Sequence, residues 1–504
     1  MRSIPLASLA FISPQEPGFE HCICGAIQSC SHNTQRRSSP IRYGSSRTGE
    51  LGGLLFCAER KFGIDMSHDD WEHFLSDARV GTRKPVSPST TATNESGRSE
   101  FHKDYDRIIF SSAFRKLADK TQVVPLPQST YTRQRLTHSL EVSCVGRSLA
   151  TLVYNSLGNK ISRIRPQGDF EAIVAAACLA HDIGNPPFGH FGEKAIQDWA
   201  TKARSGTQLQ ELTDAEFSDI ARFEGNAQTF RILTRLQMGR PGGMRLTAAT
   251  LGAVIKYPTY SRLAKTERYK KHGCVIDDAD CFEQTFQLVN RPADPNGEYA
   301  RHPLALLSEA ADDICYAIID LEDGCKSGLI VPEEAYEILD QFQTPYPSSS
   351  EKDKPMIDRI SLRRATSIGV LVEQCVGVFL DNITAIVSGS FVGSLIDHCE
   401  SHDAYQAATS ITRERVFHNE RVLAMEAAGY SAIQGLLDIL LSAAFSDEKR
   451  GYDVHVRRLT GVTLEPSMTS YQRILACTDY VSGMTDRYCL ELFETLTGHG
   501  VGSW

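Results

Sequence analysis

The sequence lacks any long apolar run free of charge. Lys, Arg, Asp or Glu interrupts the hydrophobic stretches of the 504 residues, whereas a membrane-spanning helix needs about 20 consecutive, mostly apolar residues. We therefore expect no membrane partner. With 41% hydrophobic and 23% charged residues, the chain has the composition of a globular protein that buries a large core.

A net positive charge is also absent. The 62 acidic residues outnumber the 53 Lys and Arg residues, which gives a net charge of -9. Such a chain is not built to neutralise phosphates over its whole surface, although local basic patches remain compatible with it.

The sequence shows neither a clear secretion signal nor a paired cysteine pattern. The opening MRSIPLASLAFIS has one Arg and an apolar segment that Ser and Pro dilute, and no small-residue cleavage site follows it. Of the 14 cysteines, five lie in helix-like apolar patterns, where a free thiol packs as a small hydrophobe: Cys144, Cys178, Cys315, Cys375 and Cys477. We expect a protein of the reducing cytoplasm.

Residues 1–100 lack sustained apolar periodicity and are rich in Ser, Gly, Thr and Arg. We interpret 1–65 as a disordered or dispensable extension, with Met66 as an alternative start, and 66–100 as a short helix and a linker. The helix has three apolar side chains at helical spacing, Trp71, Phe74 and Leu75. The extension also holds a cluster without a usual zinc-binding spacing: His21, Cys22, Cys24, Cys30 and His32.

From Phe101 onward, apolar residues recur at intervals of three and four, and alternating β-branched segments are rare. This pattern predicts an all-α, mainly helical fold. Gly- and Pro-rich breaks predict helix ends at 184–187, 240–243, 292–297, Gly324 and 345–355. We expect the last break to separate a helical core, 101–345, from a C-terminal helical region, 346–504.

Three stretches concentrate side chains that bind metal ions. They are RQRLTHS with His138, LAHDIGNPPFGHFGE with His181, Asp182, His190 and Glu193, and EAADDICYAIIDLED with Asp312 and Asp313. Imidazoles and carboxylates together suit Mn, Fe, Co or Zn, and they tolerate Mg. A single buried His, however, is more often a hydrogen-bonded core residue, and an Asp beside it often only caps a turn.

Residue spacing adds to these stretches. His190 and Glu193 are three residues apart and are therefore neighbours on one helix face. A hydrogen-bonded His–Glu pair beside a metal suits proton transfer. On a helix that we expect from Pro303 to Gly324, three side chains recur every four residues and share one face: Asp312, Tyr316 and Asp320.

These motifs resemble a known family. His138 in R-x-x-H, the adjacent His181 and Asp182, and Asp312 resemble the H…HD…D signature of HD-domain phosphohydrolases. With HDIGNPPFGHFGE, DYDRIIFSSAFRKLADKTQVVPL, RLTHSLEV, FEGNAQTFRIL and YVSGMTDRY, the chain is similar to the bacterial dGTP triphosphohydrolase family over about residues 100–490. The resemblance implies a metal-dependent HD core over 101–345, a C-terminal region that completes the nucleotide site, and hydrolysis of dGTP to deoxynucleoside and tripolyphosphate.

The resemblance implies one divalent ion held by His138, His181, Asp182 and Asp312. Asp313 is disfavoured by the family's spacing to Tyr316. Mn or Mg is favoured, with Fe, Co or Zn as alternatives. The ion would polarise the α-phosphate and activate a water, while His190, oriented by Glu193, would assist proton transfer to the departing 5′-oxygen.

The resemblance also implies substrate contacts. Arg135 would grip the α-phosphate, Gln122 would read the sugar 3′-hydroxyl, and Tyr316, with Asp320 on its helix face, would leave no room for a 2′-hydroxyl. Phosphate-binding positions are implied at Asn226, Lys256 and Tyr257, with Lys271 as a weaker candidate. Guanine-binding positions are implied at Glu426 and at Arg458, with Arg457 as an equal contender.

Several alternatives remain open. Within the family, base choice varies and some members need a nucleotide activator, so a broader dNTP triphosphohydrolase is an alternative. Relatives commonly form homo-hexamers, and single-stranded DNA is a known partner among them, so a regulatory protein with a vestigial HD site is another. A 5′-nucleotidase or cyclic-nucleotide phosphodiesterase is disfavoured by the NPPFGHFGE extension.

Overall fold

A computed structural model describes residues 68–81, 98–122, 133–240, 242–264, 266, 268–343, 353–446, 451–462 and 464–498. Over these residues the chain forms helices joined by turns, without a β-strand. The expected all-α fold is confirmed. The N-terminal extension 1–65, with its His and Cys cluster, lies outside the described residues.

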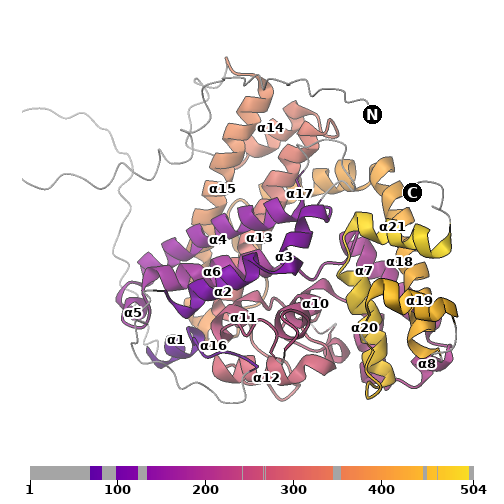
Figure 1. Cartoon of the computed structure of the whole chain (residues 1–504). Coiled ribbons are helices and arrows are strands. Elements are labelled where there is room, and N and C mark those ends of the chain that lie inside the picture. Colours follow the sequence, from indigo (N-terminus) through magenta and orange to yellow (C-terminus); the bar gives the residue numbers. More distant parts are fainter. Residues whose placement is uncertain are drawn as a thin grey trace, which may run out of the picture. The chain divides into compact units, whose positions relative to one another are not determined.

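Figure 1 shows the helices along the chain. Those before residue 345 are α1 (His68–Phe74), α2 (Glu100–Ile109), α3 (Ser112–Lys116), α4 (Arg135–Leu157), α5 (Asn159–Ser162), α6 (Gln167–Ala180), α7 (Gly189–Ala203), α8 (Thr207–Gln210), α9 (Asp214–Ala221), α10 (Gly225–Arg231), α11 (Ala248–Val254), α12 (Ala279–Leu288), α13 (Pro303–Lys326) and α14 (Pro332–Asp340). Those after it are α15 (Met356–Asp381), α16 (Ile383–Ser388), α17 (His402–Thr412), α18 (Glu420–Phe445), α19 (Gly451–Thr460), α20 (Ser470–Ser482) and α21 (Asp486–Thr497). Short 3-10 or π segments lie between them: η1 (Leu117–Asp119), η2 (Ile232–Leu236), η3 (Ser261–Leu263), η4 (Ile276–Asp278), η6 (Ile396–His398) and η7 (Arg413–Phe417).

Gly324 does not end its helix as expected, because α13 continues to Lys326. The N–H groups of Leu329 and Ile330 donate to the Gly324 carbonyl at 2.9 and 3.1 Å. A Cβ on Gly324 would lie 2.5 Å from the Ile330 side chain. The glycine is therefore needed where the following chain folds back against the helix, not at the point where the helix stops.

Helix α6 lies at the centre of the first apolar core. It packs against α2, α4, α11 and α13, and residues 172–180 are all buried. Small side chains allow this close packing: a Cβ on Gly146 of α4 would lie 2.4 Å from the Cys178 sulfur. The end of α6, where the HDIGN turn begins, is thus held by apolar contacts on several sides.

Helix α1 also belongs to the first core. Trp71, Phe74 and Leu75 are all buried, and the Trp71 ring lies 5.7 Å from that of Phe74 and 6.2 Å from that of Phe170. The expected short amphipathic helix is therefore confirmed, although most of the expected linker lies outside the described residues. Four of the five cysteines that we expected to pack as hydrophobes are buried, but Cys144 is exposed on α4, because it lies on the face of that helix turned to solvent.

A second apolar core joins residues 188–223 to residues 432–492. Trp199 and Ile196 of α7 are buried there, with Leu436 of α18 and Leu475 of α20.

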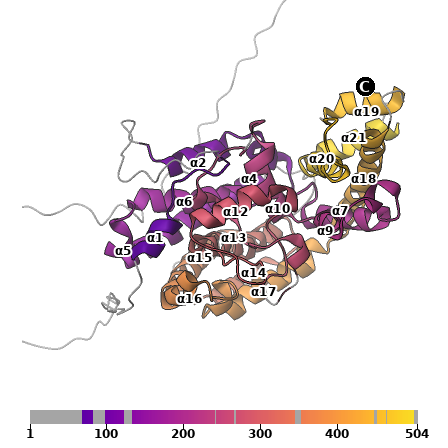
Figure 2. The same cartoon turned by 90° about the horizontal axis from the view of Figure 1, so that it is seen from below.

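Helices α15 and α17 belong to the first core, where both pack against α13. The apolar cores are therefore not divided at 345–355. In both Figure 1 and Figure 2, α19 and α21 lie well apart from α6 and α13.

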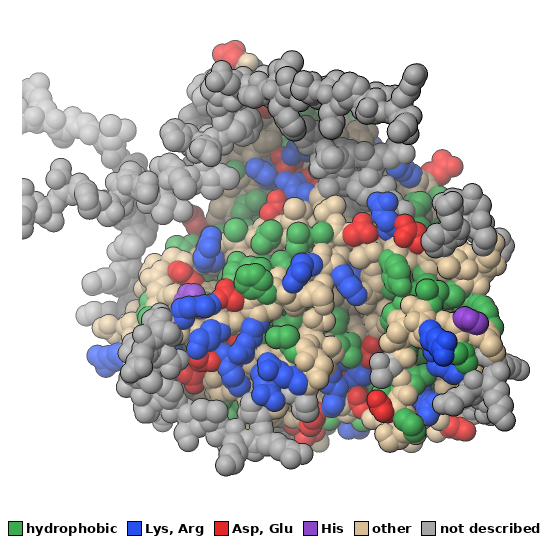
Figure 3. Space-filling model, in the orientation of Figure 1, with side chains coloured by type: hydrophobic (Ala, Val, Ile, Leu, Met, Phe, Trp, Pro, Cys, Tyr) green, Lys and Arg blue, Asp and Glu red, His purple; other side chains and the backbone are tan. Residues whose placement is uncertain are grey.

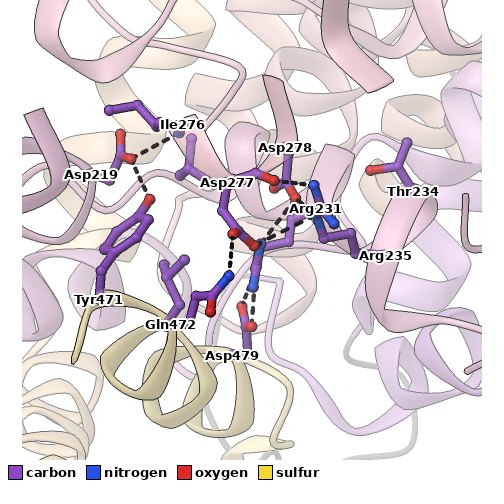
Figure 4. Close-up of polar contacts among 12 residues, drawn as sticks. Asp219, Arg231, Thr234, Arg235, Ile276, Asp277, Asp278, Tyr471, Gln472 and Asp479 are labelled. Carbon is purple, nitrogen blue, oxygen red and sulfur yellow. Dashed lines mark hydrogen bonds and ion pairs between the residues drawn. The ribbon is translucent and has the colours of Figure 1, made fainter. Parts of the chain in front are cut away.

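A polar network joins the two cores (Figure 4). The Arg231 guanidinium of α10 donates to Asp479 of α20 at 2.8 Å and to Asp278 at 2.9 Å. Nearby, Tyr471 of α20 donates to Asp219 at 2.5 Å. These charged groups are buried or half-buried, so each needs its partners to offset lost hydration.

One described helix, α18, is long and apolar enough to cross a membrane by length and composition. Charged residues still interrupt it, as we expected from the sequence, because Glu426 and Asp438 lie within the helix. Its buried side chains line the second core, and Asp438 accepts a hydrogen bond from the Trp199 indole at 2.8 Å. Core helices pass the same test, so this is weak evidence of a membrane partner.

The surface charge is uneven. On the face seen in Figure 3, Lys and Arg side chains gather at the lower left, interspersed with acidic and apolar ones. The negative net charge therefore leaves local positive regions, as the sequence allowed.

We predict that Trp71→Ala lowers the free energy of unfolding by about 3–5 kcal/mol, the usual cost of emptying a buried aromatic site. Glu72→Ala, at the exposed neighbouring position, should change it by less than about 0.5 kcal/mol. Chemical denaturation of both variants measures the difference. Equal stabilities would mean that α1 is not part of the core.

Candidate active site

Three ligand atoms from distant parts of the chain meet at one point. His138 lies on α4, His181 directly follows α6, and Asp312 lies on α13. The Asp312 carboxylate is 3.1 Å from Nε2 of His138 and 3.4 Å from Nε2 of His181. All three ligand atoms lie within 4.8 Å of one another. Ligands about 2.1 Å from a shared ion are separated by roughly 3.0–3.4 Å in octahedral or tetrahedral geometry, so two of these spacings fit one ion.

The orientation of His181 also fits a metal ligand. Its Nδ1 lies 2.6 Å from the Cys178 carbonyl, which fixes the proton on Nδ1 and leaves the Nε2 lone pair free. Nε2 is buried, and it has no hydrogen-bond partner among the described residues. Two imidazoles and a carboxylate suit a borderline divalent ion, so the donor set fits the group that the sequence implies.

Asp182 is the fourth expected ligand, and it lies at the edge of this cluster. Its Oδ1 is 3.5 Å from Nε2 of His181. Both oxygens already accept hydrogen bonds at 2.5 Å, one from Arg135 and one from the Asn185 amide. The structure therefore groups three of the four residues tightly, and a ligand role for Asp182 stays a prediction.

The cluster carries a strong negative field. Burial alone would lower the pKa of His181, but Asp182 and Asp312 outweigh it and raise that pKa to about 9. Burial would raise the pKa of Asp312, but His181 and His138 hold it well below its usual range. Asp313 faces the other way, toward Lys256 at 4.0 Å. The negative potential of Asp182 and Asp312 that favours protonation of His181 would also favour binding of a metal cation.

His190 and Glu193 form the expected pair. His190 Nδ1 is 2.8 Å from one oxygen of the buried Glu193 carboxylate, and the other oxygen accepts the Gly225 N–H at 2.8 Å. The hydrogen bond to Glu193 raises the pKa of His190. The His190 side chain is 78% exposed, so Nε2 is open to a bound molecule.

The turn between α6 and α7 is tightly packed. Phe188 has a φ of +60°, which side chains other than glycine rarely adopt. A Cβ on the next residue, Gly189, would lie 2.7 Å from the Arg135 guanidinium, and one on Gly225 would lie 2.3 Å from the Asn185 amide oxygen. The glycines thus allow Arg135 and α10 to approach the turn.

The expected phosphate-binding side chains lie in two groups. Lys256 is 3.3 Å from Glu309 and 5.8 Å from the Tyr257 ring centre. Asn226 and Lys271 both donate to one oxygen of Glu224, at 2.8 and 3.0 Å. The sequence analysis did not identify Glu224 and gave Lys271 only as a weaker candidate. The one local sign of Glu224 is that it is the acidic residue directly before GNAQ.

Two of the residues expected to bind the sugar have buried oxygens that accept no hydrogen bond from the described residues. Gln122 Oε1 and Asp320 Oδ2 are buried acceptors without a hydrogen-bond partner among the described residues. The Tyr316 ring stacks on Phe417 at 6.0 Å. Phe417 was missed because it lies 101 positions away along the chain.

The two residues expected to bind the base, Glu426 and Arg458, lie in different surroundings. Glu426 is half-buried on α18, one turn before Gly429, where a Cβ would lie 2.3 Å from the Phe188 ring in the turn between α6 and α7. Arg458 is exposed on α19, a helix that both views place away from α6 and α13 (Figures 1 and 2). Arg457 donates to the Ala443 carbonyl at 2.5 Å, so it closes the end of α18. Arg458 instead lines a surface pocket of about 420 Å³ with Tyr452, His455, Val456, Leu459 and Leu496.

Comparison with known proteins identifies relatives over most of the chain. Residues 135–284 match the HD domain model. A deoxyguanosinetriphosphate triphosphohydrolase-like protein of Pseudomonas aeruginosa is 39% identical over 445 residues, covering 85% of this chain and 99% of the relative. One from Synechocystis is 38% identical over 455 residues, with 85% and 99% covered. The deoxyguanosinetriphosphate triphosphohydrolase of Yersinia pseudotuberculosis is 30% identical over 505 residues, with 83% and 98% covered.

We predict that Asp312→Ala loses bound metal, because it removes the carboxylate that faces both histidines. Asp313→Ala, which alters the adjacent carboxylate, and His190→Ala should each retain one ion per chain. Elemental analysis after dialysis against Mn²⁺ measures the content. Loss of metal from His190→Ala would make His190 a ligand, and equal loss from both aspartate variants would refute the assignment to Asp312.

Proposed function

Because the chain belongs to the deoxyguanosinetriphosphate triphosphohydrolase family of HD-domain proteins, we propose that it hydrolyses dGTP to deoxyguanosine and tripolyphosphate. The observation that carries the proposal is the convergence of His138, His181 and Asp312, with the unpartnered Nε2 of His181 among them. A divalent ion held there, with Mn or Mg favoured, would polarise the α-phosphate and lower the pKa of an attacking water.

Arg135 would bind the α-phosphate. One guanidinium nitrogen is bonded to Asp182, and Nε is buried without a hydrogen-bond partner among the described residues. An arginine fork can hold a phosphate through the remaining N–H groups. Lys256, Lys271 and Asn226 add donors that offset the charge of the triphosphate, the main electrostatic demand of phosphoryl transfer.

His190 would protonate the leaving group. Glu193 holds the Nδ1 proton and raises the pKa of the imidazole, which favours a second proton on the exposed Nε2. As the water oxygen bonds to the α-phosphorus, the bond from phosphorus to the 5′-oxygen breaks. That oxygen takes the His190 proton and leaves as the deoxynucleoside.

The sugar would bind between Tyr316 and the unpaired acceptors. Gln122 Oε1 and Asp320 Oδ2 lack hydrogen-bond partners among the described residues, and a 3′-hydroxyl donates one hydrogen bond. Leaving a buried acceptor unpaired costs free energy, so a ligand with that hydroxyl is favoured. Tyr316, supported by Phe417, would exclude a 2′-hydroxyl by contact.

A second candidate function is that of a triphosphohydrolase that accepts several dNTPs. Arg458 lies on α19, a helix apart from α6 and α13 (Figures 1 and 2), so guanine recognition by this residue is less well supported than the triphosphate chemistry. Nucleotide activation and a homo-hexamer remain expectations from the family resemblance, as does a cytoplasmic location. A role restricted to single-stranded DNA binding is disfavoured because all ligand positions and the His190–Glu193 pair are present.

Product analysis tests the proposal. With Mn²⁺ or Mg²⁺, the protein should convert dGTP to deoxyguanosine and tripolyphosphate, and reaction in ¹⁸O-water should place the label in tripolyphosphate. The other dNTPs, singly and in pairs with dGTP, define base choice and activation. GTP should react much more slowly if Tyr316 excludes a 2′-hydroxyl. Orthophosphate or pyrophosphate as the first product would contradict attack at the α-phosphorus.

We predict that His190→Ala reduces kcat by roughly 10² to 10⁴, the usual worth of a positioned acid. It should also remove the alkaline limb of the wild-type pH profile, since the raised pKa keeps His190 protonated until the pH passes it. Lys194→Ala, at an exposed position on the same helix, should change kcat less than about twofold. Full turnover by His190→Ala would refute the proton-transfer role.

A further inference from the structure

Asp486, at the start of α21, is a buried carboxylate that binds two segments of the candidate active site. One oxygen accepts the Phe188 N–H at 3.0 Å. The other accepts the Thr121 N–H at 2.9 Å and the Thr121 hydroxyl. The residue is 1% exposed, and it makes no ion pair within 4.0 Å among the described residues. Its charge is therefore stabilised mainly by donors from these two segments.

Each of these segments leads directly to a functional group. Thr121 precedes Gln122, and the Lys120 carbonyl accepts the N–H of Arg135 at 3.2 Å. Phe188 precedes Gly189 and His190, and its left-handed backbone needs an external restraint. Asp486 thus sits between the group expected to read the 3′-hydroxyl and the expected acid.

Lys120 makes the complementary set of contacts. It is 3% exposed, and its ammonium donates to the Asn185 carbonyl at 2.5 Å and to the Ser482 carbonyl at 2.9 Å. Asn185 belongs to the same turn as Phe188, and Ser482 ends α20. The lysine therefore binds carbonyls of the HDIGN turn and of α20, while Asp486 binds N–H groups of that turn and of the segment next to the lysine.

Asp486 is not needed to begin its own helix. The N-cap of α21 is Thr485, whose hydroxyl accepts the Tyr488 N–H. A buried carboxylate is costly unless its hydrogen bonds offset the lost hydration. The contacts that offset it run to Thr121 and Phe188 rather than to α21.

We propose that Asp486, assisted by Lys120, is a positioning residue. From the second core it fixes the segment that carries Gln122, residues 117–122, relative to the turn that leads to His190, residues 183–190. The proposal rests on the proposed function for its kinetic consequences. Its structural consequence, restraint of residues 117–122 and 183–190 by Asp486, holds whatever the substrate is.

The test compares Asp486→Ala and Asp486→Asn with a matched control, Asp219→Asn. Asp219 is also a buried carboxylate, 2% exposed, that accepts one N–H, from Ile276, and two hydroxyls, from Ser261 and Tyr471. It likewise joins the two cores (Figure 4), yet it touches neither Thr121 nor Phe188. Asparagine at 486 keeps one acceptor, so its effect should be intermediate, and it serves if the alanine variant fails to fold.

Kinetics should separate positioning from loss of stability. Wild-type protein should prefer dGTP to 2′,3′-dideoxy-GTP, which lacks the 3′-hydroxyl. In Asp486→Ala this preference in kcat/KM should fall at least about tenfold and kcat about 10²-fold, since misplacing reacting groups by 1 Å costs that much. Asp219→Asn should leave the preference unchanged. An unchanged preference in both Asp486 variants would overturn the proposal.

Hydrogen–deuterium exchange makes the test independent of substrate. Asp486→Ala should accelerate exchange in residues 117–122 and 183–190, whereas Asp219→Asn should affect the regions of Ser261 and Ile276 instead. If these exchange patterns appear but no dNTP is hydrolysed, the proposed function fails and the positioning contact stands. Equal exchange in residues 183–190 for wild type and Asp486→Ala would refute the contact.

Discussion

The end of helix α6 imposes the main physical constraint on this protein. The helix is buried throughout its second half, so the His181 side chain that follows it enters a region with little water. Its Nδ1 is held by the Cys178 carbonyl, while Nε2 has no hydrogen-bond partner among the described residues and faces Asp312. A buried polar atom of this kind is costly, and a cation shared with His138 and Asp312 would satisfy it.

The rest of the site is built around the turn that follows. Arg135 packs against Gly189, Gly225 against Asn185, and Glu193 binds both His190 and the start of α10. The second core supports the turn from the other side, because a Cβ on Gly429 of α18 would lie within 2.3 Å of the Phe188 ring. Apolar packing of the two cores therefore sets the distance between the metal ligands and the candidate acid.

Local patterns in the sequence predicted the local parts of this arrangement. Helical spacing placed Asp312, Tyr316 and Asp320 on one face and paired His190 with Glu193, and the short helix at Trp71 is found in the core. Contacts between distant segments were not predictable from spacing. Glu224, Phe417, Lys120 and Asp486 gain their roles only when segments up to several hundred residues apart meet, and the second core, which joins α7 to α18 and α20, has no local signature. For the same reason, the sequence alone did not distinguish Arg458, on the distant helix α19, from the other expected substrate contacts.

Anomalous diffraction from crystals soaked in Mn²⁺ tests the central claim, a metal ion at the His138–His181–Asp312 cluster, most directly. Data collected at the manganese absorption edge should show one strong peak about 2.0–2.3 Å from His138 Nε2, His181 Nε2 and an Asp312 oxygen. The distance from this peak to Asp182 would decide whether that carboxylate is the fourth ligand. The absence of a peak at saturating Mn²⁺, or a peak on the side of Asp313 and Lys256, would contradict a metal site at this cluster.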